Sequence, residues 1–350
     1  MQENKETKHV RRVRYSGTHP KKFSEKYKEQ NPEKYADTIE KVIRKGSTPA
    51  GMHISIMVPE ILDFLQIQPG QRGLDATLGY GGHTTEMLKC LKGQGHIYGL
   101  DVDPIEIVKT KDRLMAKGFG PDILTIKQIN FANIDEVAKE AGKFDFILAD
   151  LGVSSMQIDN PERGFTYKAE GPLDLRLNPE KGESAAERLN HMDYEEIVGM
   201  LVENSDEPYA EEIAEEILKQ RKNGVIETTT NLRETIEAAL RFLPVKEQKE
   251  AVKKSCARVF QALRIDVNSE FEVLYSFLEK LPDVLAPGGR VAVLTFHSGE
   301  DRLVKKAFKD YYRDGIFSDY SKDVIRPSAE ECARNLRAKS TKMRWAVRKI

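Results

Sequence analysis

Short apolar runs alternate with amphipathic stretches along the chain between residue 53 and about residue 160. The apolar runs that predict buried strands are RGLDAT (72–77), GHIYGLDVD (95–103), DILTIKQIN (122–130) and FDFILADLG (144–152). The stretches with helical spacing are ISIMVPEILDFL (54–65), HTTEMLKCL (83–91) and PIEIVKTKDRLMAKG (104–118). Such alternation is typical of a parallel sheet that helices cover on both faces.

The alternation stops after the fourth predicted strand. Between residues 161 and 268 the pattern is helical, as in YAEEIAEEILKQRK and AVKKSCARVFQAL, and no strand is evident. It resumes with a helix that ends at Pro-Gly-Gly (270–289), a fifth buried strand (290–298) and MRWAVRK (343–349), which we expect to be an edge strand. We therefore predict four parts: an N-terminal extension (1–50), a first part of an α/β domain (51–160), an inserted helical domain (161–268) and a second part of the α/β domain (269–350).

The charges are distributed unevenly. The formal net charge is −1, but Lys and Arg exceed Asp and Glu by 6 in residues 1–48 and by 6 in residues 321–350, which leaves −13 for the residues between them. Basic ends on an acidic body are typical of terminal segments that contact a polyanion such as a nucleic acid. Solvated tails without a partner are the alternative.

Cysteine usage and hydropathy narrow the protein class. Cys90, Cys256 and Cys332 lie far apart and form neither a metal-spaced pair nor a disulfide framework, as is usual in a reducing compartment. No apolar run approaches the roughly 20 residues of a membrane span, and the N-terminus lacks the apolar stretch of a signal peptide. We expect a cytoplasmic protein that does not contact a membrane.

A glycine-rich turn in LDATLGYGGHTTEM (74–87) indicates a nucleotide cofactor. A P-loop is excluded because His83 stands where that motif requires Lys, and the dinucleotide fingerprint lacks its third glycine. An acid at the end of each of the first two strands, Asp75 and Asp101, favours S-adenosylmethionine. Glycine lets the backbone approach the cofactor closely, and a carboxylate accepts both ribose hydroxyls. A turn with no ligand remains the alternative.

Longer blocks of sequence carry a family resemblance. They are GYGGH (79–83), ADLGVSSMQIDNPERGFTYKAEGPLDLRL (149–177), FQALRIDVNSE (260–270), LAPGGR (285–290) and FHSGEDR (296–302). From about His53 to Lys349 the chain resembles the bacterial MraW family, also called ribosomal RNA small subunit methyltransferase H. These enzymes methylate N4 of a cytosine in 16S ribosomal RNA, in the decoding region of the small ribosomal subunit.

The resemblance implies a Rossmann-like class I S-adenosylmethionine methyltransferase fold, with the helical insert recognising the substrate. It implies that Asp101 binds the cofactor ribose and that Phe131 stacks near the adenine. The cofactor-binding positions that it implies are Gly81, Gly82, His83, Asp101, Phe131, Asp150 and Gln157. The plainer alternatives are that Phe131 is a core residue, His83 a helix cap and Gln157 a surface side chain.

The amine of cytosine is a weak nucleophile, so we expect a group that accepts its N–H bonds and orients it. Asp150, at the end of the fourth strand, and His297 are the catalytic candidates, and no metal is required. The base must leave its stack. The substrate candidates are Phe165, Tyr167 and Phe296 for stacking, Asp174, His297 and Ser298 for the base edge, and Arg163, Arg176, Arg258 and Arg264 for phosphates.

Several alternatives remain open at this stage. The arginines of the insert can equally pair with nearby acids, and FHSGEDR can simply be a strand end at which Glu300 and Asp301 begin a helix. Gly299 stands where Leu is common in the family, and the C-terminal segment also departs from the usual pattern. Methylation of another RNA or of DNA, or a non-catalytic role in ribosome assembly, are the alternative functions. The oligomeric state is open, a homodimer included.

Overall fold

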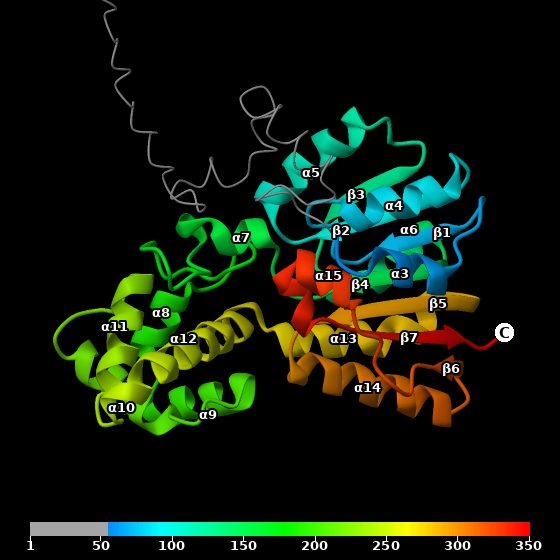
Figure 1. Ribbon diagram of the computed structural model, residues 1–350. Helices are drawn as coiled ribbons and strands as arrows, with labels where there is room; N and C mark the ends of the chain where they lie inside the picture. Colours follow the sequence, from blue (N-terminus) through cyan, green and yellow to red (C-terminus); the bar gives the residue numbers. More distant parts are fainter. Residues whose placement is uncertain (1–54) are drawn as a thin grey trace, which may run out of the picture. The chain divides into compact units, whose positions relative to one another are not determined.

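The computed structural model describes residues 55–350, which contain a seven-stranded sheet (Figure 1). The predicted N-terminal extension, residues 1–50, lies outside the described residues. The strands are β1 (Arg72–Asp75), β2 (His96–Asp101), β3 (Leu124–Gln128), β4 (Phe144–Asp150), β5 (Leu285–Thr295), β6 (Phe317–Tyr320) and β7 (Lys342–Arg348). Within residues 55–350, no helix combines the length and the apolar character needed to cross a membrane.

The strand order is β3-β2-β1-β4-β5-β7-β6, with β1 to β5 parallel and β7 antiparallel to both its neighbours. The strand β1 lies between β2 and β4, so the order of the strands reverses there. Asp75, Asp101 and Asp150 are the last residues of β1, β2 and β4, and they therefore reach the same edge of the sheet. Open α/β sheets bind their ligands at such a switch point, beyond the carboxyl ends of the strands.

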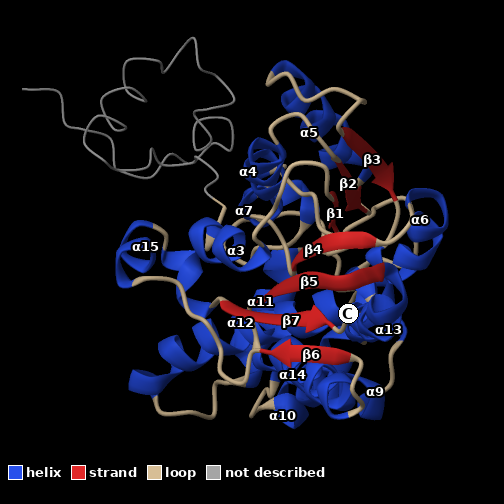
Figure 2. Ribbon diagram, turned by 90° about the vertical axis from the view of Figure 1, so that its right-hand side faces the viewer, coloured by secondary structure: helices blue, strands red, loops and turns tan. Residues whose placement is uncertain are grey.

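Helices cover both faces of the sheet, as the alternating pattern predicts (Figure 2). One face carries α3 (Val58–Leu65), α4 (Gly82–Leu91) and α5 (Pro104–Ala116), and the other carries α6 (Ile134–Ala141), α13 (Glu270–Val284) and α14 (Ser298–Arg313). Phe146 and Ile147, successive residues of β4, point to opposite faces. Phe146 packs in the first core and Ile147 in the second. This fold is a Rossmann-like α/β fold.

The chain after β4 forms a helical cluster with a core of its own. Its helices are α7 (Ser155–Asp159), α8 (Ala185–His191), α9 (Tyr194–Ser205), α10 (Ala210–Arg221), α11 (Thr229–Ala239) and α12 (Val245–Asn268). Leu189, Ile213 and Leu263 are fully buried in this core, which is separate from the two cores at the sheet. Ser269 adopts a left-handed conformation between α12 and α13, so the chain changes direction where it returns to the sheet.

Two sequence predictions are wrong in detail. MRWAVRK forms β7, but β7 is internal because β5 and β6 pair with its two sides. The edge strand on this side of the sheet is β6, whose four residues are too few for a pattern of period two to be recognised. The Pro-Gly-Gly segment that we expected to end a helix lies inside β5, where the pairing with β4 shifts register between Phe144 and Phe146.

Candidate active site

Asp75 stabilises the connection that follows β1. Its carboxylate is buried and accepts hydrogen bonds from the Thr84 hydroxyl, at 2.5 Å, and from the backbone N–H of Thr77, at 3.2 Å. Burial raises the pKa of Asp75, and the hydrogen bond from Thr84 acts in the opposite direction. Because both oxygens are directed at the β1–α4 connection, Asp75 positions the glycine turn and the start of α4.

The turn itself depends on glycine at two positions. Gly79 and Gly81 have φ values of 48° and 77°, in the left-handed region that other residues rarely adopt. A Cβ atom at Gly81 would also lie 2.9 Å from the Thr110 side chain. The Thr110 hydroxyl donates a hydrogen bond to the carbonyl oxygen of Gly79, at 2.6 Å. The turn is therefore held from α5 as well as from β1.

Asp101 faces this turn from the end of β2. Its Oδ2 accepts a hydrogen bond from the backbone N–H of Gly79, at 2.7 Å, and its Oδ1 accepts one from the N–H of Asp103, at 2.9 Å. Burial raises the pKa of Asp101 to about 6, against the effect of these hydrogen bonds. A carboxylate has about four lone pairs, so each oxygen can accept one further bond from a ligand hydroxyl.

Asp150 and His83 meet beside the turn. His83 Nδ1 lies 3.5 Å from Asp150 Oδ2, and His83 Nε2 lies 2.9 Å from the carbonyl oxygen of Ile56. Its ring thus bridges two elements instead of capping α4. Within the described residues, the buried Oδ1 of Asp150 has no hydrogen-bond partner. Burial raises the pKa of Asp150 to about 6, although His83 lowers it. An unpartnered buried carboxylate oxygen is suited to a ligand that donates hydrogen bonds.

A cavity of about 450 Å³ joins these groups, a size usual for a ligand site. Six of the seven cofactor candidates line it: Gly82, His83, Asp101, Phe131, Asp150 and Gln157; Gly81 does not, and neither does Asp75. Phe131 begins a short helix (Phe131–Asn133) and packs edge-on against Phe277, at 5.3 Å between ring centroids. It is therefore a core contact on one side and a cavity wall on the other. The donor set, a glycine turn with two carboxylates and an aromatic wall, fits S-adenosylmethionine.

Gln157 is buried and belongs to a polar network. Its Nε2 donates to Asp103 Oδ2, at 2.8 Å, and Arg163 Nη1 donates to the same oxygen, at 2.8 Å. Its Oε1 accepts from the N–H of Ser154 and caps α7. Only 8% of Gln157 is exposed, so the surface alternative is wrong. The network ties the loop after β4 to the end of β2.

The structure separates the substrate candidates. Phe296 and Arg264 line the cavity. Phe165 is buried in the core of the insert, and Tyr167 packs edge-on against Phe260 at its margin. Asp174 forms an ion pair with Arg176, at 2.7 Å. Ser298 is the first residue of α14, and His297 precedes it; neither lines the cavity.

An ionic cluster lies at the α12–α14 end of the cavity; the sequence alternative that Arg264 pairs with a nearby acid is confirmed, whereas the cluster as a whole was missed. Arg264 pairs with Glu270, at 2.8 Å, and His297 Nε2 lies 3.3 Å from Glu300 Oε1. Glu300 also accepts a hydrogen bond from the N–H of Phe296, at 2.8 Å. It therefore helps to begin α14, in agreement with the sequence alternative that Glu300 and Asp301 begin a helix. Burial acts to raise the pKa of Glu300, but the interactions with His297 and Arg264 outweigh it and lower the pKa.

This cluster contains atoms that could ligate a cation. Ligand atoms of Glu270, His297 and Glu300 lie within 4.8 Å of one another. Both oxygens of Glu270, however, accept hydrogen bonds from the Arg264 guanidinium. The positive charge beside these carboxylates is therefore supplied by an arginine. The signal available in the sequence was FQALRIDVNSE (260–270), which contains both partners of this pair.

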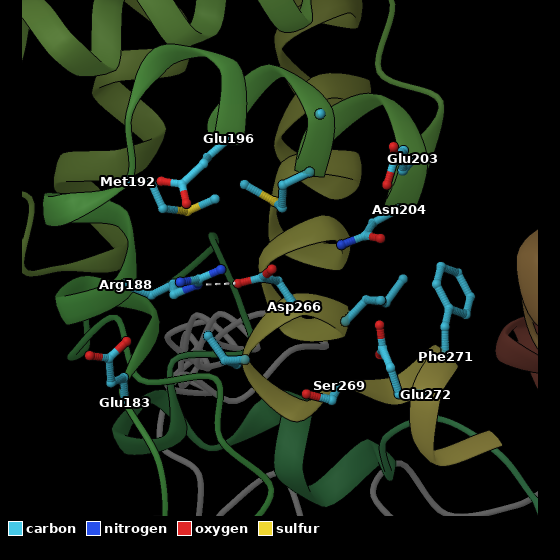
Figure 3. Close-up of a pocket in the computed structure, with 14 residues that line it drawn as sticks. Glu183, Arg188, Met192, Glu196, Glu203, Asn204, Asp266, Ser269, Phe271 and Glu272 are labelled. Atoms are coloured by element: carbon cyan, nitrogen blue, oxygen red, sulfur yellow. Dashed lines mark hydrogen bonds and ion pairs between the residues drawn. The ribbon is translucent and has the colours of Figure 1, made fainter. Parts of the chain in front are cut away.

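A second cavity, of about 610 Å³, lies between α8, α9, α12 and the start of α13 (Figure 3). One ion pair crosses it, from Arg188 to Asp266, at 2.8 Å. Its remaining charged lining residues are Glu183, Glu196, Glu203 and Glu272. It contains no cofactor candidate, and its negative charge does not suit a polyanion.

Comparisons with known proteins agree with the resemblance. The model of the MraW methylase family matches residues 50–349. A protein of Lachnoclostridium phytofermentans named Ribosomal RNA small subunit methyltransferase H 1 is 73% identical over 99% of this chain and 95% of its own length. A protein of the same name from Agathobacter rectalis is 70% identical, over 99% of each chain. Ribosomal RNA small subunit methyltransferase H 2 of Alkaliphilus metalliredigens is 62% identical, again over 99% of each. These relatives align with most of residues 1–49, which the family model leaves out.

Proposed function

The chain belongs to the MraW methylase family, and on that premise we propose that it methylates N4 of a cytidine in 16S ribosomal RNA of the small ribosomal subunit. It is a methyltransferase, and S-adenosylmethionine is its methyl donor. The observation that carries the proposal is that one cavity contains the glycine turn, Asp101 and the unpartnered Oδ1 of Asp150. A methyl donor and an amine acceptor can therefore meet in the same space.

The residues at the strand ends are assigned to the cofactor. The turn at Gly79–Gly82 and the carboxylate of Asp101 would hold the amino-acid and ribose parts of S-adenosylmethionine, and Phe131 would lie against the adenine. When bound, S-adenosylmethionine supplies a methyl carbon on a sulfonium, and N4 takes this carbon as the carbon–sulfur bond breaks, with S-adenosylhomocysteine as the second product.

Asp150 is assigned to the amine. Its Oδ1 would accept an N–H bond of the exocyclic amine and direct the nitrogen lone pair toward the methyl carbon. N4 loses one proton in the reaction, and the ionised Asp150 carboxylate can receive it. His83, whose Nδ1 lies 3.5 Å from Asp150 Oδ2, would fix the orientation of the carboxylate. His297 contacts Glu300 but does not line the cavity, so we assign it a positioning role.

The substrate must bring a single base to a cavity at the edge of the sheet. A base of folded ribosomal RNA reaches such a site only by leaving its stack. Arg337, in the short helix Leu336–Ser340, lines the cavity and is exposed. It pairs with Asp159 at 2.8 Å. Residues 329–340 contain Arg334, which pairs with Glu330, and the exposed Lys339, so the segment has one positive charge more than it has negative charges, which favours RNA phosphates. We expect the reaction to occur in the cytoplasm, where ribosomal subunits are assembled.

The test is a methyl-transfer assay with three acceptors. The purified full-length protein is incubated with labelled S-adenosylmethionine and unmethylated small subunits, free 16S ribosomal RNA or DNA, and the nucleosides are then identified by mass spectrometry. We expect N4-methylcytidine from the small subunit or its RNA. Transfer of the label to DNA, or formation of a different methylated nucleoside, would show that the substrate is not the one proposed. Absence of transfer to all three, with cofactor binding retained, would favour a non-catalytic role in assembly.

A further inference from the structure

The last turns of α12 bring polar side chains to the same cavity. Gln261, Arg264 and Asn268 are spaced by three and four residues, so they lie on one face of the helix. All three line the cavity that contains Asp150 and Phe296. The methyl-transfer mechanism described above assigns none of the three a role.

Arg264 is held in one orientation by Glu270. Arg264 Nε donates to Glu270 Oε1, at 2.8 Å, and Arg264 Nη2 donates to Glu270 Oε2, at 2.9 Å. Two parallel hydrogen bonds between planar groups fix both the position and the plane of the guanidinium. Only 15% of the Arg264 side chain and 12% of the Glu270 side chain are exposed. The pair is therefore rigid and largely excluded from water.

One nitrogen of Arg264 is left available. Within residues 55–350, Arg264 Nη1 makes no hydrogen bond, although the side chain lines the cavity. Asn268, on the same helix face, uses its amide within the protein: Nδ2 donates to the carbonyl of Leu175, and Oδ1 accepts from the N–H of Leu177. The cavity thus presents a cationic donor at the α12 end and the acceptor Oδ1 of Asp150 at the β4 end.

This arrangement is complementary to the edge of cytosine, which offers acceptors at O2 and N3 and a donor at the N4 amine. We propose, as an extension of the proposed function, that Arg264 recognises the target cytosine by donating from Nη1 to N3 and O2. Glu270 is the positioning residue that holds the guanidinium, Phe296 lies against the ring, and Asp150 receives the amine.

The same arrangement rejects uracil. Uracil has an N–H at N3 and a carbonyl oxygen at position 4. The guanidinium of Arg264 would then face a donor, and the carboxylate of Asp150 would face an acceptor. Buried polar groups left without partners in this way give strong discrimination. A phosphate contact by Arg264, considered from the sequence, would provide no such selection.

The test combines a change in the enzyme with a change in one atom of the base. Small subunits are reconstituted with 16S ribosomal RNA that carries either cytidine or 3-deazacytidine at the target position. The analogue has C–H in place of N3 and keeps the amine and O2. The ratio of kcat/KM for the two substrates is measured for the wild type, Arg264→Lys and Glu270→Gln, together with S-adenosylmethionine affinity and thermal unfolding to confirm folding.

We expect kcat/KM of the wild type to be about tenfold or more lower on the 3-deazacytidine substrate than on the cytidine substrate. Arg264→Lys should lower kcat/KM on the cytidine substrate by about the same factor. It should lower kcat/KM on the 3-deazacytidine substrate little further, because the contact with N3 is already absent there. Glu270→Gln should lie between them, since the guanidinium is then less firmly held. Arg233→Lys, which changes an arginine paired with Glu237 in α11 outside the cavity lining, is the matched control and should keep the full penalty.

The outcomes separate this inference from the proposed function. If the wild type forms no N4-methylcytidine on the cytidine substrate, the proposed function fails. If it does, but Arg264→Lys shows the same deaza penalty as the wild type, only the role of Arg264 fails. A uniform loss on both substrates would identify a phosphate or structural contact and would also overturn the inference. Should Arg264→Lys not fold, the Glu270→Gln ratio decides: an unchanged ratio overturns the inference.

Discussion

The two ends of the active-site cavity are held together by different interactions. At the strand ends, most of the contacts involve the backbone. The N–H groups of Gly79 and Asp103 donate to the Asp101 carboxylate, and left-handed glycines shape the turn. At the α12–α14 end, side chains hold side chains, through the Arg264–Glu270 and His297–Glu300 pairs.

This difference has consequences for how each end responds to change. At the strand ends, Asp101 bonds to the backbone of Gly79 and Asp103 whereas Asp150 faces His83, so a change at one carboxylate leaves the contacts of the other in place. A buried ion pair leaves an uncompensated charge when one partner is removed, so the loss spreads to its neighbours. The cofactor end should therefore give separable effects on binding and on chemistry, whereas the α12–α14 end should give coupled ones.

The largest separable effect is expected at Asp150. Asp150→Asn keeps the size of the side chain but removes the charge that orients the amine and receives its proton. We expect single-turnover methyl transfer at saturating cofactor to fall by about 100-fold or more. Asp122→Asn, an exposed carboxylate outside the cavity, is the control and should keep the wild-type rate. An unchanged rate for Asp150→Asn would remove it from the mechanism.

A smaller effect, on binding alone, is expected at Asp101. Asp101→Asn replaces an ionised acceptor of two hydroxyls and should weaken S-adenosylmethionine and S-adenosylhomocysteine alike, by about 10- to 100-fold in Kd measured by calorimetry. Turnover at saturating cofactor should stay close to that of the wild type. If saturation does not restore the rate, Asp101 also takes part in chemistry, and the two ends are less distinct than the structure indicates.

The pH dependence of cofactor affinity separates the two carboxylates. The pKa of Asp150 is raised to about 6, mainly by burial, so it is ionised above this pH and neutral below it. Between about pH 8 and about pH 5, the affinity for the cationic sulfonium relative to that for neutral S-adenosylhomocysteine should fall by about tenfold. The pKa of Asp101 is also about 6, but it affects both ligands equally. Asp150→Asn should abolish the pH dependence of this ratio, and a ratio that still varies would assign it to another group.

The smallest effect concerns Gly299, the second residue of α14. A Cβ atom at Gly299 would lie 2.6 Å from Cζ of Phe271, so the Phe271 ring occupies the space of a larger residue. Gly299→Leu should lower the free energy of unfolding by about 1–3 kcal/mol, measured by denaturant titration. In a protein that already carries Phe271→Ala, Gly299→Leu should lower the free energy of unfolding by less than it does in the wild type. Strictly additive effects would show that the two residues do not compete for space.

Much of the sheet end could be predicted because its signals are local. Alternating apolar runs predict parallel strands with helices on both faces, and the structure confirms this fold. Carboxylates at the ends of parallel strands must reach the same edge of the sheet, so Asp101 on β2 and Asp150 on β4, with β1 between them, could be expected at that edge. Glycines 79 and 81 adopt the left-handed conformations that a tight turn after β1 requires.

Residues of the insert were harder to place from sequence alone. Phe165 and Tyr167 stand in the block that resembles the family, yet their rings complete the core of the helical cluster. An aromatic side chain in such a block is equally compatible with a core and with a base-stacking surface. Which of the two applies depends on where the neighbouring helices lie.

The sequence by itself determined the strands, the glycine turn and the carboxylates beyond β2 and β4, because backbone hydrogen bonding and burial impose short periods that a local pattern displays. Only the tertiary structure decided the partners of the charged side chains. Arg163 pairs with Asp103, 60 residues away in the chain, and Arg264 pairs with Glu270 across the left-handed turn at Ser269. Electrostatic attraction depends on distance in space and on exclusion of water, and neither quantity exists until the helices have packed against the sheet.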